Sequence, residues 1–299
     1  MKILLLGQNG QVGWELQRAL APLGEVVGCD RDSPGDLRAD FSQTDSLRAL
    51  VRRVQPDAIV NAAAHTAVDK AESEPDLARA INATAPGVLA AEAAALGAWL
   101  VHYSTDYVFD GSGDQSRDED APTGPLSVYG RTKLDGEQAI RASGCRHLIL
   151  RTSWVHAARG GNFARTMLRL AAERDELQVI DDQVGAPTGA DLLADVSAHA
   201  LRAAVARPAL TGTYHCVAGG ETSWHGYARF VIEWARAQGQ PVKVAAAAIR
   251  AVPTAAFPTP ARRPLNSRLS TAKLQTAFGL RLPHWQPGVE RMLREVLGT

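Results

Sequence analysis

Short apolar runs alternate with longer amphipathic segments over the first 150 residues or so, and this alternation restricts the fold more than any other feature. The apolar runs predict strands at residues 2–7, 25–30, 58–64, 98–105 and 147–153. The segments between them predict helices at residues 13–22, 44–54, 76–96 and 128–142. Strands and helices that alternate in this way build a parallel sheet from βαβ units. We therefore expect an α/β fold with a Rossmann-type, doubly wound parallel sheet.

The pattern becomes less regular after about residue 155. Further helices are predicted near residues 162–173, 190–206, 223–238, 270–278 and 287–297, with scattered strands at 177–181 and 212–218. This indicates a smaller α/β lobe at the carboxyl edge of the sheet. We expect a dinucleotide-binding domain at 1–153 and a mainly substrate-binding lobe at 154–299, although later segments can return to the first domain. The proline-rich stretch 252–268 predicts an irregular loop, either near the site or a plain surface connection.

Composition limits the partners and the compartment. The 32 basic residues balance the 32 acidic ones, so no net field attracts nucleic acid or an anionic membrane. We find no apolar stretch of the roughly 20 residues that a membrane span needs, and the first apolar run is too short for a signal peptide. Cys29, Cys145 and Cys216 are far apart in the sequence and predict reduced, buried thiols. We expect a cytoplasmic protein.

A glycine-rich turn follows the first predicted strand. Gly7, Gly10 and Gly13 have the spacing G-x-x-G-x-x-G, and Gln11 and Val12 lie between the last two. Glycines at this position let the backbone approach a pyrophosphate, which the N-terminus of the next helix attracts. A turn needed only for packing is the alternative. The position after the first strand favours a dinucleotide site.

The end of the second predicted strand bears on the choice of dinucleotide. Asp30 can accept hydrogen bonds from an adenosine ribose, as in NAD sites. The neighbouring Arg31 can instead hold the 2′-phosphate of NADP. The residues leave the choice between NAD and NADP open.

Tyr129 and Lys133 form the pattern Y-x-x-x-K in a chain with only five tyrosines and five lysines. On a helix, residues four positions apart lie on one face. The pair is either ordinary helix surface or a proton donor beside its cation. In the second case the ammonium would lower the tyrosine pKa from about 10 toward neutrality.

Several segments together resemble the extended short-chain dehydrogenase/reductase family, namely "GQNGQVG", "HYSTDYVFDG" and "YGRTK". Others are similar to its dTDP-4-dehydrorhamnose reductase branch, namely "NAAAHTAVDKAESEP", "RTSWVH", "DDQVGAPTG" and "RRPLNSRLS". The resemblance covers essentially the whole chain. It implies reduction of dTDP-4-dehydro-6-deoxy-L-mannose to dTDP-L-rhamnose, the last step of dTDP-L-rhamnose synthesis. NADPH would be preferred and NADH accepted.

The resemblance also implies roles for single residues. Thr105, Tyr129 and Lys133 would be catalytic, and Lys133 would also bind the nicotinamide ribose. Asp106 is followed by a tyrosine where related dehydratases have a glutamate, so reduction is favoured and Asp106 would hold a sugar hydroxyl. Trp154 would stack on the sugar, with a place in the core as the alternative. Candidates for the substrate diphosphate, or else plain surface cations, are Arg262, Arg263 and Arg268.

Other predicted contacts concern the cofactor, a metal and a second subunit. The loop predicted to pass over the pyrophosphate and nicotinamide contains Ala63, Ala64, His65 and Thr66, and His65 would be a structural or cofactor contact. Asp40 and Phe41 would lie beside the adenine. The family often forms homodimers, in some members with Mg²⁺ held by acidic residues. Glu15 and Asp191 match those ligands, but an aspartate replaces the expected glutamate at the second.

Two other functions are compatible with this fold. One is another nucleotide-sugar reductase or an epimerase. The other is a non-catalytic regulatory subunit that keeps a cofactor site. Because Thr105, Tyr129 and Lys133 are all present, the reductase is favoured over both.

Overall fold

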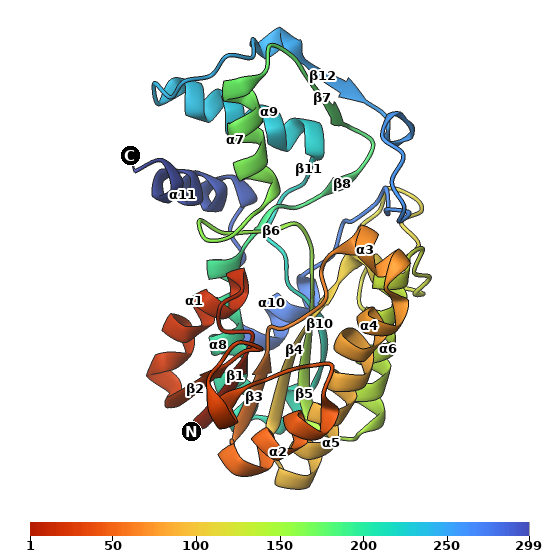
Figure 1. Ribbon diagram of the computed structural model, residues 1–299, viewed down its shortest axis with the longest axis vertical. Helices are drawn as coiled ribbons and strands as arrows, with labels where there is room; N and C mark the ends of the chain where they lie inside the picture. The colour runs from red at the N-terminus through yellow and green to blue at the C-terminus, as the bar shows by residue number, and fades with distance from the viewer. Residues whose placement is uncertain (299) are drawn as a thin grey trace.

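A six-stranded parallel sheet forms the centre of the computed structural model, which describes residues 1–298 apart from the side chain of Asp36 (Figure 1). The strand order is β10-β5-β4-β3-β1-β2. The bounds of these strands are β1 Lys2–Leu6, β2 Glu25–Cys29, β3 Ala58–Asn61, β4 Trp99–Thr105, β5 Arg146–Thr152 and β10 Gly212–His215. The strands in the middle of the sheet are buried along their length and mostly apolar, as expected when helices cover both faces.

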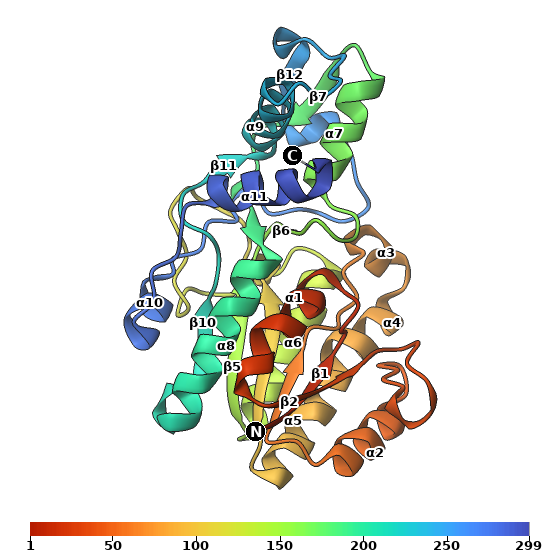
Figure 2. The same cartoon turned by 90° about the vertical axis from the view of Figure 1, so that its left-hand side faces the viewer.

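Helices cover the two faces of this sheet (Figures 1 and 2). On one face lie α1 (Gln11–Leu20), α8 (Ala190–Ala206) and the short α10 (Ala272–Phe278). On the other lie α2 (Thr44–Val54), α5 (Ala85–Leu96) and α6 (Val128–Ala142). The amphipathic pattern explains the packing, because α1 turns Gly13, Leu16 and Leu20 inward at helical spacing.

A smaller part of the molecule lies at the carboxyl ends of the strands (Figure 1). Its core is built by α7 (Phe163–Glu173), α9 (Trp224–Ala237) and α11 (Trp285–Leu297). Three two-stranded pairs belong here: β6 Val155–His156 with β9 Thr188–Gly189, β7 Leu177–Ile180 with β12 Ile249–Val252, and β8 Val184–Gly185 with β11 Thr222–Ser223. Since α8 and β10 pack with the large sheet, the second half of the chain contributes to both parts. A boundary at residue 153 stays a prediction.

The observed elements differ from the predicted ones in three places, one of which is the strand predicted at 212–218, which ends at His215. The helix predicted at 76–96 is split into α4 (Pro75–Arg79), a π-helical turn (Ala80–Thr84) and α5, and a short helix α3 (Val68–Ser73) precedes it. The strand predicted at 58–64 ends at Asn61 because the chain then passes over Gly7. The other predicted helices begin and end within two residues of the observed ones. The stretch 252–268 is largely irregular, as predicted.

Two further predictions concern the thiols and the membrane. Cys29, Cys145 and Cys216 are buried and free, as predicted. Among residues 1–298, none of the helices combines the length and the apolar character needed to cross a bilayer.

Candidate active site

The glycine turn and the loop after β3 meet at the point where the strand order reverses. The chain runs from β1 to β2 on one side of β1 and then to β3 on the other side. Gly7 has φ +82°, and a Cβ built on it would lie 2.8 Å from the Ala63 nitrogen. A Cβ on Gly13 would lie 1.9 Å from the Gly7 oxygen. Only glycine fits at either place, and such a switch point is where open α/β sheets bind nucleotides.

The start of α1 can receive a pyrophosphate. Gly10 is its N-cap and supplies no side-chain cap, so the N–H groups of the first turn point toward the crevice without a side-chain acceptor. Gln11 begins the helix, and its Oε1 lies 3.3 Å from Asn162 Nδ2 just before α7. Val12 packs against the core. These features fit a dinucleotide, whose phosphates these N–H groups would hold.

The residues predicted at the adenosine end lie beyond β2. Asp30 accepts hydrogen bonds from the Asn9 amide and from the Asp32 backbone N–H at 2.9 Å, so its own turn holds the carboxylate in place. The Arg31 side chain is 74% exposed and lies 3.6 Å from Asp32. Phe41 is buried, and Asp40 accepts hydrogen bonds from Ser42. Arg31 is therefore free to reorient, whereas Asp30 is fixed.

The loop Ala63–Thr66 is anchored by Asn82 from the π-helical turn. The His65 N–H donates to Asn82 Oδ1 at 2.8 Å, and Asn82 Nδ2 donates to the His65 carbonyl at 3.1 Å. The His65 ring lies 3.6 Å from Glu74. Asn82 is 1% exposed, and no motif in the sequence pointed to it. The loop is therefore held in place by Asn82, a residue that lies outside it.

Thr105 and Tyr129 meet at the carboxyl end of β4. Thr105 is the last residue of β4 and Tyr129 lies in the first turn of α6, whose N-cap Ser127 accepts a hydrogen bond from the Gly130 N–H. The Thr105 hydroxyl lies close enough to Tyr129 to lower its pKa. Burial nevertheless raises the pKa of Tyr129 well above its ordinary value, and the negative charge of Asp106 raises it further.

Lys133 does not face Tyr129 in the predicted way. Its Nζ donates to the Tyr103 carbonyl at 2.5 Å and lies 3.4 Å from His102 Nε2. Burial raises the pKa of Tyr129, and Lys133 is not among the charged groups that act on it here, so the lowering of the Tyr129 pKa by Lys133 stays a prediction. Burial also lowers the pKa of Lys133, to about 8.

Asp106 is buried directly beside Thr105. Burial raises its pKa to about 6, and the nearby Ser267 and Thr105 hydroxyls oppose that rise. Ser267 comes from the irregular stretch near the C-terminus and was not predicted. A carboxyl group and two hydroxyls gathered at a strand end can bind sugar hydroxyls.

Trp154 lies between the two parts of the molecule, just after β5. Its φ is +48°, which is unusual for a residue other than glycine. Its ring stacks on Trp224 with centroids 3.6 Å apart, and Trp224 Nε1 donates to Gln183 Oε1 at 3.1 Å. A Cβ on Gly185 would lie 3.0 Å from both Trp154 and Ser267. The ring is thus placed near the hydroxyl groups beside Asp106.

The three predicted arginines have different environments. Arg263 donates to Asp69 of α3 at 2.7 Å and lies 3.4 Å from the Tyr107 hydroxyl, so it faces the site. Arg268 pairs with Glu221 at 2.7 Å, and Arg262 is exposed. Only Arg263 of the three contacts a residue adjacent to Asp106.

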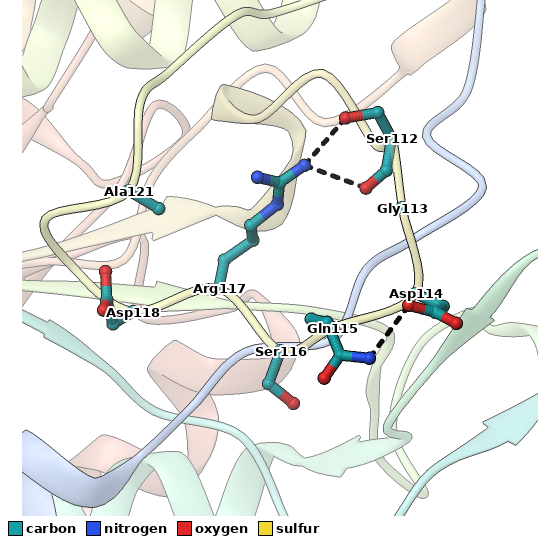
Figure 3. A pocket seen from close by; sticks show the side chains of 8 residues that line it. All are labelled: Ser112, Gly113, Asp114, Gln115, Ser116, Arg117, Asp118 and Ala121. Atoms are coloured by element: carbon teal, nitrogen blue, oxygen red, sulfur yellow. Dashed lines mark hydrogen bonds between the residues drawn. The ribbon is translucent and has the colours of Figure 1, made fainter.

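A surface pocket and the predicted metal site are distinct from this site. A pocket of about 380 Å³ is lined by Ser112–Asp118 and Ala121, where Arg117 donates to Ser112 (Figure 3). None of the predicted site residues lines it. At the predicted metal site, Asp191 pairs with Arg291 at 3.0 Å. Within residues 1–298 no group of three His, Cys, Asp or Glu side chains could hold a metal, so Mg²⁺ is not supported.

The fold and the site together define a class. A switch-point crevice with a glycine turn, next to Thr105, Tyr129 and Lys133, is the arrangement of a nucleotide-dependent reductase of the extended short-chain dehydrogenase/reductase type.

Comparisons with known proteins narrow the class to one family. The family model described as the RmlD substrate binding domain matches residues 1–297. A dTDP-4-dehydrorhamnose reductase of Shigella flexneri is 58% identical over 299 residues, covering 100% of this chain and 99% of the relative. The crystal structure of a dTDP-4-dehydrorhamnose reductase from Clostridium acetobutylicum has a TM-score of 0.88 at 37% identity and covers 100% of both chains. One from Bacillus anthracis, in complex with NADP, has a TM-score of 0.88 at 33% identity and covers 98% of this chain and 99% of its own.

The chain therefore belongs to the dTDP-4-dehydrorhamnose reductase family, and it is an NAD(P)H-dependent oxidoreductase. The family match runs through both parts of the molecule, so it includes the segments around Trp154 and Ser267. This favours the reductase over the epimerase and the regulatory subunit.

Proposed function

We propose that the protein reduces the 4-keto group of dTDP-4-dehydro-6-deoxy-L-mannose to give dTDP-L-rhamnose, the last step of dTDP-L-rhamnose synthesis, with Tyr129 as the proton donor. The observation that carries the proposal is the meeting of Thr105 and Tyr129 beside the nucleotide crevice. The names of relatives similar over the whole chain support the substrate.

The chemistry requires two additions to the carbonyl group. NADPH, when bound, supplies the hydride that forms the new C–H bond, and the carbonyl oxygen then needs a proton. Tyr129 gives its O–H proton to that oxygen while Thr105 holds the same oxygen by a hydrogen bond. The raised pKa of Tyr129 keeps the hydroxyl protonated at neutral pH. An alkoxide is more basic still, so the transfer runs downhill.

Lys133 and the loops have positioning roles. Lys133 would hold the nicotinamide ribose, and the first-turn N–H groups of α1 would hold the pyrophosphate. Asp106 and Ser267 would bind sugar hydroxyls, and Trp154 would form one wall of the sugar pocket. Arg263 is the arginine best placed for the substrate diphosphate, because Asp69 already holds its guanidinium near Tyr107.

The test is NADPH oxidation, which should require the dTDP-4-keto sugar. Tyr129→Phe should lower kcat by at least about 100-fold, since general acid catalysis is typically worth that much. Cofactor affinity, measured by fluorescence titration, should stay within a few-fold. Turnover retained in Tyr129→Phe would refute the proton donor. An enzyme that converts the sugar without net NADPH consumption would instead be an epimerase.

A further inference from the structure

Lys133 stands at the end of a buried chain of hydrogen bonds that begins at the cofactor loop. The Ala63 N–H donates to Asn61 Oδ1 at 3.1 Å, and Asn61 Nδ2 lies 3.0 Å from His102 Nδ1. His102 Nε2 lies 3.4 Å from Lys133 Nζ. Asn61 ends β3 and pairs in register with His102 of β4. The three side chains are 0%, 1% and 2% exposed, so water does not compete for these contacts.

The direction of this chain follows from the donors and acceptors. Because a backbone N–H fixes Asn61 Oδ1 as an acceptor, the amide presents its NH₂ group to His102. An NH₂ group only donates, so His102 Nδ1 must accept and cannot carry a proton. Burial holds the pKa of His102 well below its ordinary range, so the ring is neutral and carries its single proton on Nε2. That N–H is directed at Lys133, whose ammonium form has only donors.

We propose that Asn61 and His102 form a positioning pair that turns an N–H toward Lys133 Nζ and thereby lowers the pH at which Lys133 loses its proton. The pair connects the loop that carries Ala63 to the lysine. The importance of this pair for turnover rests on the role proposed above for Lys133. Its effect on the titration of Lys133 does not depend on that role.

Burial lowers the pKa of Lys133, and the charged groups around it do not add to that fall. Glu137, one turn further along α6, raises the pKa of Lys133, and it is itself bound by Arg151 of β5 and Arg141 of α6. Tyr103 of β4 contributes its carbonyl, which accepts a hydrogen bond from Nζ. Asp106 acts on Tyr129. His102 is the neighbouring side chain whose N–H faces the ammonium, and its effect would add to that of burial.

The tautomer can be read directly in the unaltered protein. In protein labelled with ¹⁵N at its eight histidines, two-bond correlation spectra distinguish a protonated ring nitrogen from an unprotonated one, and His102→Phe identifies the His102 signals by their loss. We expect the proton on Nε2. A proton on Nδ1, or a His102 ring that is charged at neutral pH, would overturn the proposal.

The effect on Lys133 is tested by ¹³C labelling at lysine Cε, since the chain has only five lysines. Asn61→Asp keeps an oxygen for the Ala63 N–H, but its second oxygen accepts a proton from His102 Nδ1. His102 Nε2 then carries a lone pair that accepts a hydrogen bond from the Lys133 ammonium. We expect the Lys133 titration midpoint to rise by about one pH unit or more. An unchanged midpoint would contradict the proposal.

A second variant separates the tautomer from simple charge. In the double variant Asn61→Asp/His102→Phe the new carboxylate remains but the ring that relays it is gone, so most of the shift relative to His102→Phe should disappear. An equal shift in both backgrounds would overturn the relay through His102. These measurements use the protein without substrate. If the proton-donor test with Tyr129→Phe failed, the titration results for Lys133 would still hold. If the titration results contradicted the proposal about His102, the proposed reaction would still hold.

Discussion

Asp30 and Arg31, adjacent at the end of β2, favour different adenosine riboses. The Asp30 carboxylate is held by Asn9 and by its own turn, and it can accept from both ribose hydroxyls of NADH. The exposed Arg31 can turn toward the 2′-phosphate of NADPH and offset the repulsion from Asp30. A fixed carboxylate and a mobile guanidinium therefore predict use of both cofactors.

We predict that NADPH is preferred by about tenfold or less, which corresponds to about 1.4 kcal/mol. Arg31→Ala should lower kcat/KM for NADPH and leave NADH nearly unchanged, whereas Asp30→Ala should impair NADH more. The measurement is the ratio of kcat/KM for the two cofactors in the three proteins. A ratio that does not respond to Arg31→Ala would show that other residues select the cofactor.

The raised pKa of Asp106 predicts a pH dependence of sugar binding. The carboxyl group is mostly protonated at pH 5 and mostly ionised at pH 7, because its pKa is about 6. An ionised carboxylate is the better acceptor for a sugar hydroxyl, so KM for the sugar should fall as pH rises through about 6. Hydrogen bonds to charged groups contribute about 1.5–3 kcal/mol, so the change should be about tenfold or more. In Asp106→Asn, KM should be higher at neutral pH and should not change across this range.

The same group has an opposite effect on folding. Since the folded chain keeps the Asp106 proton to a higher pH than the unfolded chain, this carboxyl contributes stability at low pH that is lost as pH rises through about 6. Binding improves over the same interval. As the pH rises through about 6, the affinity for the sugar thus increases while this carboxyl group stabilises the folded chain less.

At the scale of elements, α6 is held on the sheet by a buried ion pair. Glu137 is fully buried and accepts from Arg151 Nη2 of β5 at 2.7 Å and from Ser104 of β4 at 2.6 Å. Because α6 also carries Tyr129 and Lys133, this pair fixes the helix that presents the side chains proposed to be catalytic.

Removing one partner should therefore be costly. Arg151→Met leaves the Glu137 carboxylate buried without its main partner and should lower the free energy of unfolding by about 3–5 kcal/mol. Urea denaturation measures this. Arg169→Met is the matched control, because it breaks the exposed Arg169–Glu173 pair of α7 and should cost no more than about 0.5 kcal/mol. Equal losses in the two variants would contradict the role of the buried pair.

Element positions and the place of Thr105 at the end of a strand could be predicted, but contacts between distant elements could not. Amphipathic spacing located the helices, and the strand-end motif located Thr105. The pairing of Asn61 with His102 depends on the register of β3 against β4, which no local pattern encodes. Ser267 was missed because an irregular proline-rich stretch has no periodicity that would place it beside Asp106.

At the scale of the whole molecule, the proposed sugar site is assembled from both parts. Asp106 follows β4 of the large sheet, whereas Trp154 stacks on Trp224 at the start of α9. Arg263 reaches back from the late irregular stretch to Asp69 of α3. Neither part alone contains the groups proposed to bind the sugar nucleotide.

Trp154→Ala should therefore raise KM for the sugar with little change in KM for the cofactor, because one wall of the sugar pocket is lost while the crevice at Gly7 is untouched. Trp224→Ala should act in the same direction, since the Trp154 ring loses its stacking partner. Steady-state kinetics with each substrate varied in turn will distinguish the two constants. An unfolded Trp154→Ala protein would assign the ring to the core instead.

The π-helical turn Ala80–Thr84 limits how this chain can change length during evolution. A π-helical turn contains one residue more than an α-helical turn, so it is equivalent to a single-residue insertion. Deleting one residue there would restore a regular helix and rotate Asn82 by about 100° relative to the residues that follow. The His65 backbone would then lose both of its hydrogen bonds to Asn82. Gaps are usually tolerated in surface loops, but this family should not tolerate one inside this helix.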